Sequence, residues 1–62
     1  MHYDYVVSEK GKGNYLTLQD AVNAAPKGQK TKILVLDGTW EKPTIEKGKK
    51  ISFKKFPNVV IK

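Results

Sequence analysis

The sequence predicts a small α/β domain in which one short helix packs on several short strands. Three observations lead to this. The chain has 62 residues, which is enough for one domain. Residues 17–25 carry the signals of a single helix, and residues 33–36 form a continuous apolar run. Short strands between polar turns follow, and they are typical of the coils of a solenoid or of a small meander or barrel. A small α+β sheet domain is the alternative.

The first strand is expected over residues 3–8, where aromatic and β-branched residues are concentrated. The stretch 9–14 that follows is polar and contains two glycines, so it is expected to be a turn.

The helix is expected over residues 17–25. Thr17 is a favourable N-cap, because its hydroxyl can accept a hydrogen bond from a free backbone N–H in the first turn. Leu18 and Val22 lie four residues apart and share one face, which must pack against the rest of the domain. Pro26 ends the helix, since a residue before proline is disfavoured in the α conformation.

Four further strands are predicted after the helix, all of them short and apolar on at least one face. In a solenoid, the segments near 33–36, 44–46 and 51–54 would form one coil, and Val59–Ile61 would stack on Ile33–Val35. The predicted bounds of these strands are 32–37, 43–46, 51–54 and 58–61.

A spaced pattern of residues runs through most of the chain. It consists of Val6-Val7, Gly11-x-Gly13-x-Tyr15-x-Thr17, Ala21, Ala24-Ala25-Pro26, Lys30-Thr31-Lys32 before the apolar run, and Gly38-Thr39-Trp40. Over roughly residues 5–53 this pattern resembles the N-terminal portion of pectin methylesterases, in the pectate-lyase-like group. The sequence departs from the family at Trp40, where the family usually has Tyr, and at Lys42, where it has Glu.

The resemblance implies a right-handed parallel β-helix, with the helix as an N-terminal cap on one to two coils and residues 1–62 as a single cap module. The family's catalytic carboxylates lie in later coils, and no position here matches them. The chain is therefore expected not to be an enzyme and to have no catalytic residues. The absence of arginine and the early end of the chain favour an excised or designed module.

Composition narrows the function classes. The chain has no cysteine and one histidine, so neither a disulfide nor a metal site is expected, and no cofactor motif is present. Its net charge of +6 is carried by twelve lysines without any arginine, which makes nucleic acid an unfavoured partner. No apolar run approaches the length of about 20 residues needed to span a membrane, so no membrane association is expected. No secretory signal is present, which leaves the compartment open, although the resembled family is mostly extracellular.

Two surfaces are candidates for binding. Lys49, Lys50, Lys54 and Lys55 form a basic cluster that either protects exposed strand edges or weakly binds an acidic polysaccharide. Val59, Val60 and Ile61 would end the stack with an unpaired edge, which favours self-association and most simply a homodimer. Trp40 with Tyr3, Tyr5 and Tyr15 is a candidate for a surface on which sugars stack, but Trp40 is expected to pack in the core or at a corner.

Three functions follow from these features. The favoured one is a non-catalytic structural module that self-associates through its C-terminal coil. The alternatives are the front fragment of a pectin-active carbohydrate esterase and a small lysine-rich domain that binds polyanions.

Overall fold

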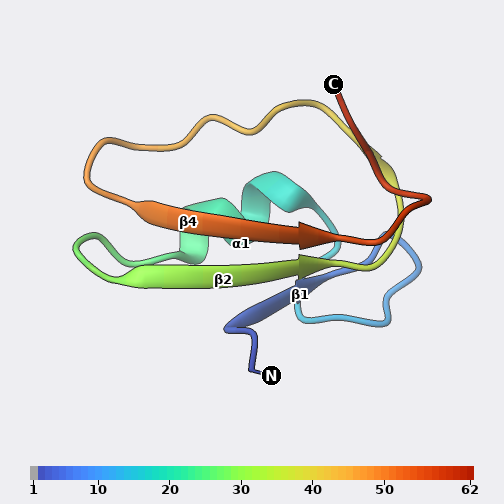
Figure 1. The fold of residues 1–62 in the computed structure, drawn as a ribbon, viewed down its shortest axis with the longest axis horizontal. Helices are drawn as coiled ribbons and strands as arrows, with labels where there is room; N and C mark the ends of the chain where they lie inside the picture. The colour runs from blue at the N-terminus through green and yellow to red at the C-terminus, as the bar shows by residue number, and fades with distance from the viewer. Residues whose placement is uncertain (1) are drawn as a thin grey trace.

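The computed structural model describes residues 2–62, in which five short strands and one helix follow in the order β1-α1-β2-β3-β4-β5 (Figure 1). The elements are β1 (Tyr5–Val7), α1 (Leu18–Ala24), β2 (Lys30–Val35), β3 (Thr39–Trp40), β4 (Lys50–Lys55) and β5 (Val60–Ile61).

The strands form two parallel sheets. One has three strands in the order β1-β2-β4, and the other pairs β3 with β5. Neighbouring parallel strands cannot be joined by a tight hairpin. Each connection must therefore cross back to the end of the sheet at which the next strand begins. Helix α1 lies in the first connection, and residues 36–49 make the second. Figure 1 shows β1, β2 and β4 pointing the same way, with α1 behind them.

The predicted β-helix is wrong, and the chain is a small α+β domain, which was the alternative. The segment 43–46 contains no strand, so no third sheet forms and no coil closes. Val60–Ile61 pair with Thr39–Trp40 and not with Ile33–Val35. Ile33–Val35 already have neighbours on both edges, since β1 lies on one side and β4 on the other.

The local prediction of the helix is confirmed. Thr17 has an extended backbone, and its Oγ1 accepts a hydrogen bond of 3.1 Å from the backbone N–H of Asp20. Ala25 returns to an extended conformation directly before Pro26, as the steric effect of proline requires. Helix α1 is only 7 residues long, so it depends on packing for its stability.

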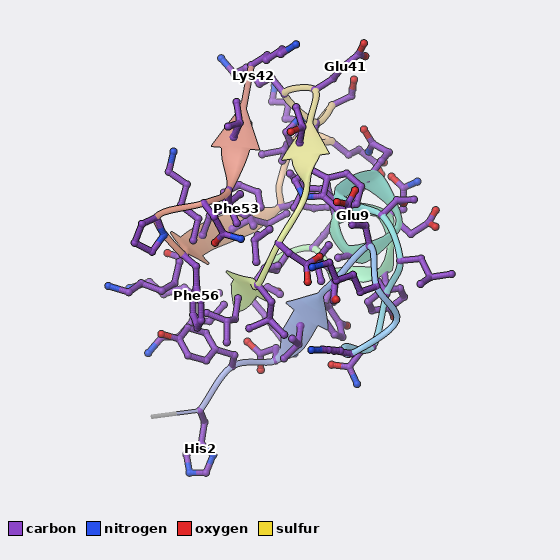
Figure 2. All side chains as sticks on the ribbon, turned by 90° about the vertical axis from the view of Figure 1, so that its right-hand side faces the viewer. His2, Glu9, Glu41, Lys42, Phe53 and Phe56 are labelled. Atoms are coloured by element: carbon purple, nitrogen blue, oxygen red, sulfur yellow. The ribbon has the colours of Figure 1, made fainter. Side chains whose placement is uncertain are left out.

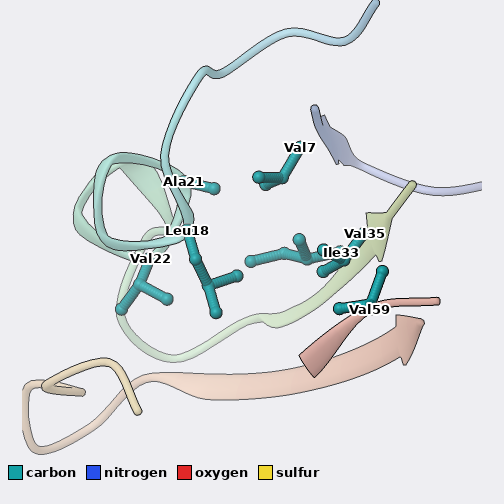
Figure 3. Packing of buried hydrophobic residues seen from close by; sticks show 7 residues of the cluster. All are labelled: Val7, Leu18, Ala21, Val22, Ile33, Val35 and Val59. Carbon is teal, nitrogen blue, oxygen red and sulfur yellow. The ribbon is translucent and has the colours of Figure 1, made fainter. Parts of the chain in front are cut away.

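The core lies between α1 and the two sheets (Figure 3). Leu18 and Val22 are both buried, as predicted, and contact the inward side chains of the strands. The partly buried rings of Tyr5, Tyr15 and Trp40 pack around this cluster. The buried cluster consists of Val7, Leu18, Ala21, Val22, Ile33, Val35 and Val59.

A buried polar pair joins the ends of β1 and β2. The Ser8 hydroxyl donates a hydrogen bond of 2.9 Å to a carboxylate oxygen of Asp37, and both residues are buried. The other oxygen of Asp37 accepts a bond of 2.7 Å from the backbone N–H of Glu9. The carboxylate therefore satisfies donors that the turn after β1 would otherwise leave unpaired.

Candidate functional site

The outward face of β2 carries lysine side chains. Thr31, Ile33 and Val35 are buried, so the alternation of a strand directs Lys30 and Lys32 to the opposite face, where both are exposed. This face of the sheet lies on the side away from the core.

Strand β4, the neighbour of β2 in the sheet, also directs lysine side chains to this outward face. Its parallel register places Lys50 beside Lys30, Ser52 beside Lys32, and Lys54 beside Leu34. Residues paired in this way project from the same face of a sheet. The four exposed lysines that share this face, called the lysine face below, are Lys30, Lys32, Lys50 and Lys54.

The lysine face holds like charges at close range. Neighbouring strands lie about 4.8 Å apart, and like charges directly opposite one another destabilise a sheet. Lys30 and Lys50 occupy such a position. Within residues 2–62, the ion pairs are Lys27–Glu46 and Lys49–Glu46, so none of them involves a lysine of this face. The Asp4 carboxylate lies nearby, and one of its oxygens accepts a hydrogen bond of 2.7 Å from the backbone N–H of Lys32.

A shallow hollow of about 180 Å³ opens beside the lysine face. The short side chain of Ser52 lines it together with the longer side chains of Lys32 and Lys54. One end is formed by the segment that precedes β1, where His2 lies far from Glu41 and Lys42 (Figure 2). The lining residues are His2, Tyr3, Lys32, Ser52, Phe53 and Lys54.

The predicted basic cluster is divided by the structure. Lys50 and Lys54 belong to the lysine face, whereas Lys55 lies opposite Val35 on the other side of β4. The Nζ atom of Lys49 is turned inward and donates hydrogen bonds of 3.0 Å to the carbonyl oxygens of Val22 and Asn23. Lys49 therefore supports the end of helix α1 and is not free to bind a ligand.

The three residues predicted for self-association differ in exposure. Val59 is buried in the core, Val60 is 47% exposed, and Ile61 is half-buried. Strand β5 forms one edge of the two-stranded sheet, as β4 does of the three-stranded sheet. Phe53 in β4 and Phe56 in the turn after β4 are also exposed, at the edge formed by β4 (Figure 2).

Lys30 and Lys32 are not among the predicted site residues, because the strand predicted there begins at residue 32, whereas β2 begins at Lys30. The sequence signal that could have indicated an earlier start of the strand is the alternation Lys30-Thr31-Lys32-Ile33. In it, lysine occupies every second position, which is the period of a strand.

Trp40 serves the packing and does not form an exposed stacking surface. Its Nε1 donates a hydrogen bond of 3.0 Å to the backbone oxygen of Asp37, and its ring lies against Gly38. A Cβ atom at Gly38 would lie 2.7 Å from this ring, so a larger residue would displace the tryptophan.

No family model, curated protein or solved structure matches the chain. The resemblance to pectin methylesterases therefore stays a prediction. Among residues 2–62, no helix has the length and apolar character required to cross a bilayer. Within the same residues, no three histidine or acidic side chains come together as potential metal ligands.

Proposed function

We propose that this chain is a small lysine-rich domain that binds a linear acidic polysaccharide on its lysine face. The observation that carries the proposal is the parallel register of β2 and β4, which places Lys30 directly beside Lys50 with no carboxylate between them. A bound polyanion would relieve this repulsion, and binding would recover the stability that the two ammonium groups remove from the sheet.

The chemistry of lysine favours a carboxylated or sulfated sugar chain over nucleic acid. Lysine provides a compact point charge, whereas arginine provides the paired donors that read guanine and phosphate. The chain has no arginine, and β4 with the turn after it exposes two rings, Phe53 and Phe56, for base stacking. The flat face with lysines on adjacent strands instead matches a chain of regularly repeated charges.

The test is titration with polygalacturonate at several salt concentrations, with duplex DNA of equal charge as the comparison. The site variant carries Lys30→Gln, Lys32→Gln, Lys50→Gln and Lys54→Gln. Each exposed ion pair contributes about 0.5 kcal/mol, so the loss of four weakens binding by about 2 kcal/mol, or more than tenfold in Kd. Wild-type affinity is expected to fall as salt rises.

The matched control carries Lys10→Gln, Lys12→Gln, Lys42→Gln and Lys62→Gln. Both variants have a net charge of +2, which is the wild-type +6 less four lysines. The control is expected to bind much more tightly than the site variant. Equal weakening in both would mean that net charge alone attracts the polysaccharide, and tighter binding of DNA would contradict the choice of ligand.

A second function, self-association, is favoured by the exposed apolar side chains beside the free edges of β4 and β5. Phe56 is 45% exposed and Val60 is 47% exposed. Since a self-complementary patch most often closes into a two-fold dimer, sedimentation at micromolar concentration is expected to show a dimer. The variant Val60→Thr is expected to shift the protein toward monomer. A wild-type monomer whose melting temperature is independent of concentration would contradict this second function.

A further inference from the structure

The hollow beside the lysine face has a geometry that suits an anionic ligand. Lys32 and Ser52 are direct neighbours across β2 and β4, and Lys54 follows Ser52 by two residues on the same face. Strand spacing and rise place the Cα atoms of Lys32 and Lys54 about 8 Å apart across the diagonal. Two ammonium groups can therefore approach one anionic group from both sides, with the Ser52 hydroxyl at its base.

The size of the hollow limits what it can hold. Its volume of about 180 Å³ greatly exceeds the space for a single water molecule, which is about 10–15 Å³ by the same measure. It is smaller than the roughly 300 Å³ at which pockets for drug-sized ligands begin. A single charged substituent, with part of the ring that carries it, fits between these limits.

The walls suit such a group. Tyr3, which is half-buried, lines the hollow and offers an aromatic side chain, while the stems of Lys32 and Lys54 offer apolar surface below their charged ends. The acid nearest to this site along the chain is Asp4, and one oxygen of its carboxylate accepts a hydrogen bond of 2.7 Å from the backbone N–H of Lys32. No ion pair between residues 2 and 62 engages either lysine.

The geometry points to a discrete oxyanion subsite, in which Lys32, Lys54 and Ser52 hold one carboxylate, sulfate or phosphate group while Tyr3 contacts the ring that bears it. The subsite rests on the proposed function, because it would bind one charged unit of the polysaccharide. The subsite can also be tested separately from the proposed function. A single small anion is expected to saturate the subsite, whereas the rest of the lysine face attracts anions without holding them at one position.

The test is a titration of backbone amide chemical shifts in the full chain with sodium sulfate, sodium phosphate, sodium acetate and sodium glucuronate. Saturable shifts confined to Lys32 and the segment 52–54 are expected. Glucuronate is expected to bind several-fold more tightly than acetate, because only glucuronate carries a ring. Sulfate and phosphate carry charge but no sugar ring, so their affinities show how much the charged group contributes to binding without the sugar.

The decisive variant is Ser52→Leu, which fills the hollow while it keeps every lysine and the net charge. It is expected to lose saturable anion binding yet to retain most of the salt-dependent binding of polygalacturonate. Ser52→Ala keeps the space, removes only the hydroxyl, and is expected to weaken anion binding by a few-fold. Should Ser52→Leu fail to fold, the Lys32→Gln and Lys54→Gln single variants are expected to weaken binding more than Lys30→Gln does.

The outcomes separate the subsite from the wider function. Saturable anion binding without any binding of polygalacturonate would support the subsite and overturn the proposed function. If polygalacturonate binds but the small anions cause only diffuse shifts that do not saturate, the proposed function would be supported and the subsite overturned. Undiminished anion binding by a folded Ser52→Leu variant would also overturn the subsite.

Discussion

The Nζ atom of Lys49 donates a hydrogen bond of 3.0 Å to the carbonyl oxygen of Val22, at the end of helix α1. A second bond of the same length reaches Asn23, and only 7% of the lysine side chain is exposed. The last carbonyls of a helix lack the partner four residues further on that the other carbonyls have, and the helix dipole makes this end negative. The carbonyl oxygen of Val22 also accepts a bond of 3.2 Å from the backbone N–H of Ala25. Lys49, the residue directly before β4, therefore caps a helix whose Asn23 lies 26 residues earlier in the chain.

Replacing Lys49 is expected to destabilise the fold. Lys49→Met keeps the apolar stem but removes both hydrogen bonds, so the free energy of unfolding should fall by about 1.5–3 kcal/mol. Urea unfolding followed by circular dichroism measures this change. The control is Lys47→Met, at an exposed position two residues away, where a change of less than about 0.5 kcal/mol is expected. Equal effects at the two positions would contradict the capping role.

Replacing Asp37 is expected to loosen the turn after β1. Asp37→Ala leaves the Ser8 hydroxyl and the Glu9 N–H without their acceptor, which should reduce stability by about 1–3 kcal/mol. Thermal unfolding of this variant can be compared with that of Glu41→Ala, which removes an exposed carboxylate. The amide of Glu9 should also exchange its hydrogen faster in Asp37→Ala. Unchanged exchange there would argue against the bond.

Gly13 is expected to tolerate no side chain. A Cβ atom there would lie 2.3 Å from the carbonyl oxygen of Val6, which accepts hydrogen bonds from the backbone of Asn14 and Tyr15. Gly13→Ala must therefore displace backbone in the first strand, with a loss of about 1–3 kcal/mol or more. Gly28 has a φ of +81° and nothing within 4 Å of its Cβ position. Gly28→Ala should cost only about 1–2 kcal/mol, from the left-handed conformation alone.

The ion pair between Lys27 and Glu46 is expected to make a small, pH-dependent contribution. Its atoms lie 2.7 Å apart, and the hydrogen bond and charge of Lys27 hold the pKa of Glu46 below its ordinary value. A carboxyl whose pKa is lowered on folding stabilises the protein above its unfolded pKa, and this stability is lost as the pH falls through the folded pKa. Solvent screens the pair, since both side chains are about 60% exposed.

The check is the melting temperature of wild type and Glu46→Gln across acid and neutral pH. The small difference expected at neutral pH should shrink as the pH falls below the carboxyl's ordinary range, and it should also shrink in high salt. Glu41→Gln provides the control, because Glu41 is exposed and forms no ion pair within residues 2–62. A difference that grows toward acid pH would contradict the sign.

Local signals in the sequence predicted the helix well. The hydroxyl of Thr17, the spacing of Leu18 and Val22 and the position of Pro26 each act within a few residues, and the structure contains the cap, the buried face and the stop that they predict. The apolar run from Ile33 also lies in a strand, in which Ile33 and Val35 are buried and Leu34 is half-buried.

Strand pairing could not be predicted in the same way, because register depends on contacts between distant segments. Thr39–Trp40 form a strand only because Val60–Ile61 lie beside them, and the apolar character of Ile45 did not make a strand of 43–46. In the site, the two lysines of β2 join those of β4 through a register that no local pattern contains.

The positions of the two chain ends determine how the domain responds to tension. Strand β1 forms one edge of the three-stranded sheet, and the chain ends on the side of β4, the opposite edge, after β5 has paired with β3 (Figure 1). A force applied between β1 and the C-terminus would act first on the pair β3–β5 and then across β1, β2 and β4, along the hydrogen bonds that join them. These bonds would break one after another, so the domain would yield at low force if it were placed as a link in a stretched chain.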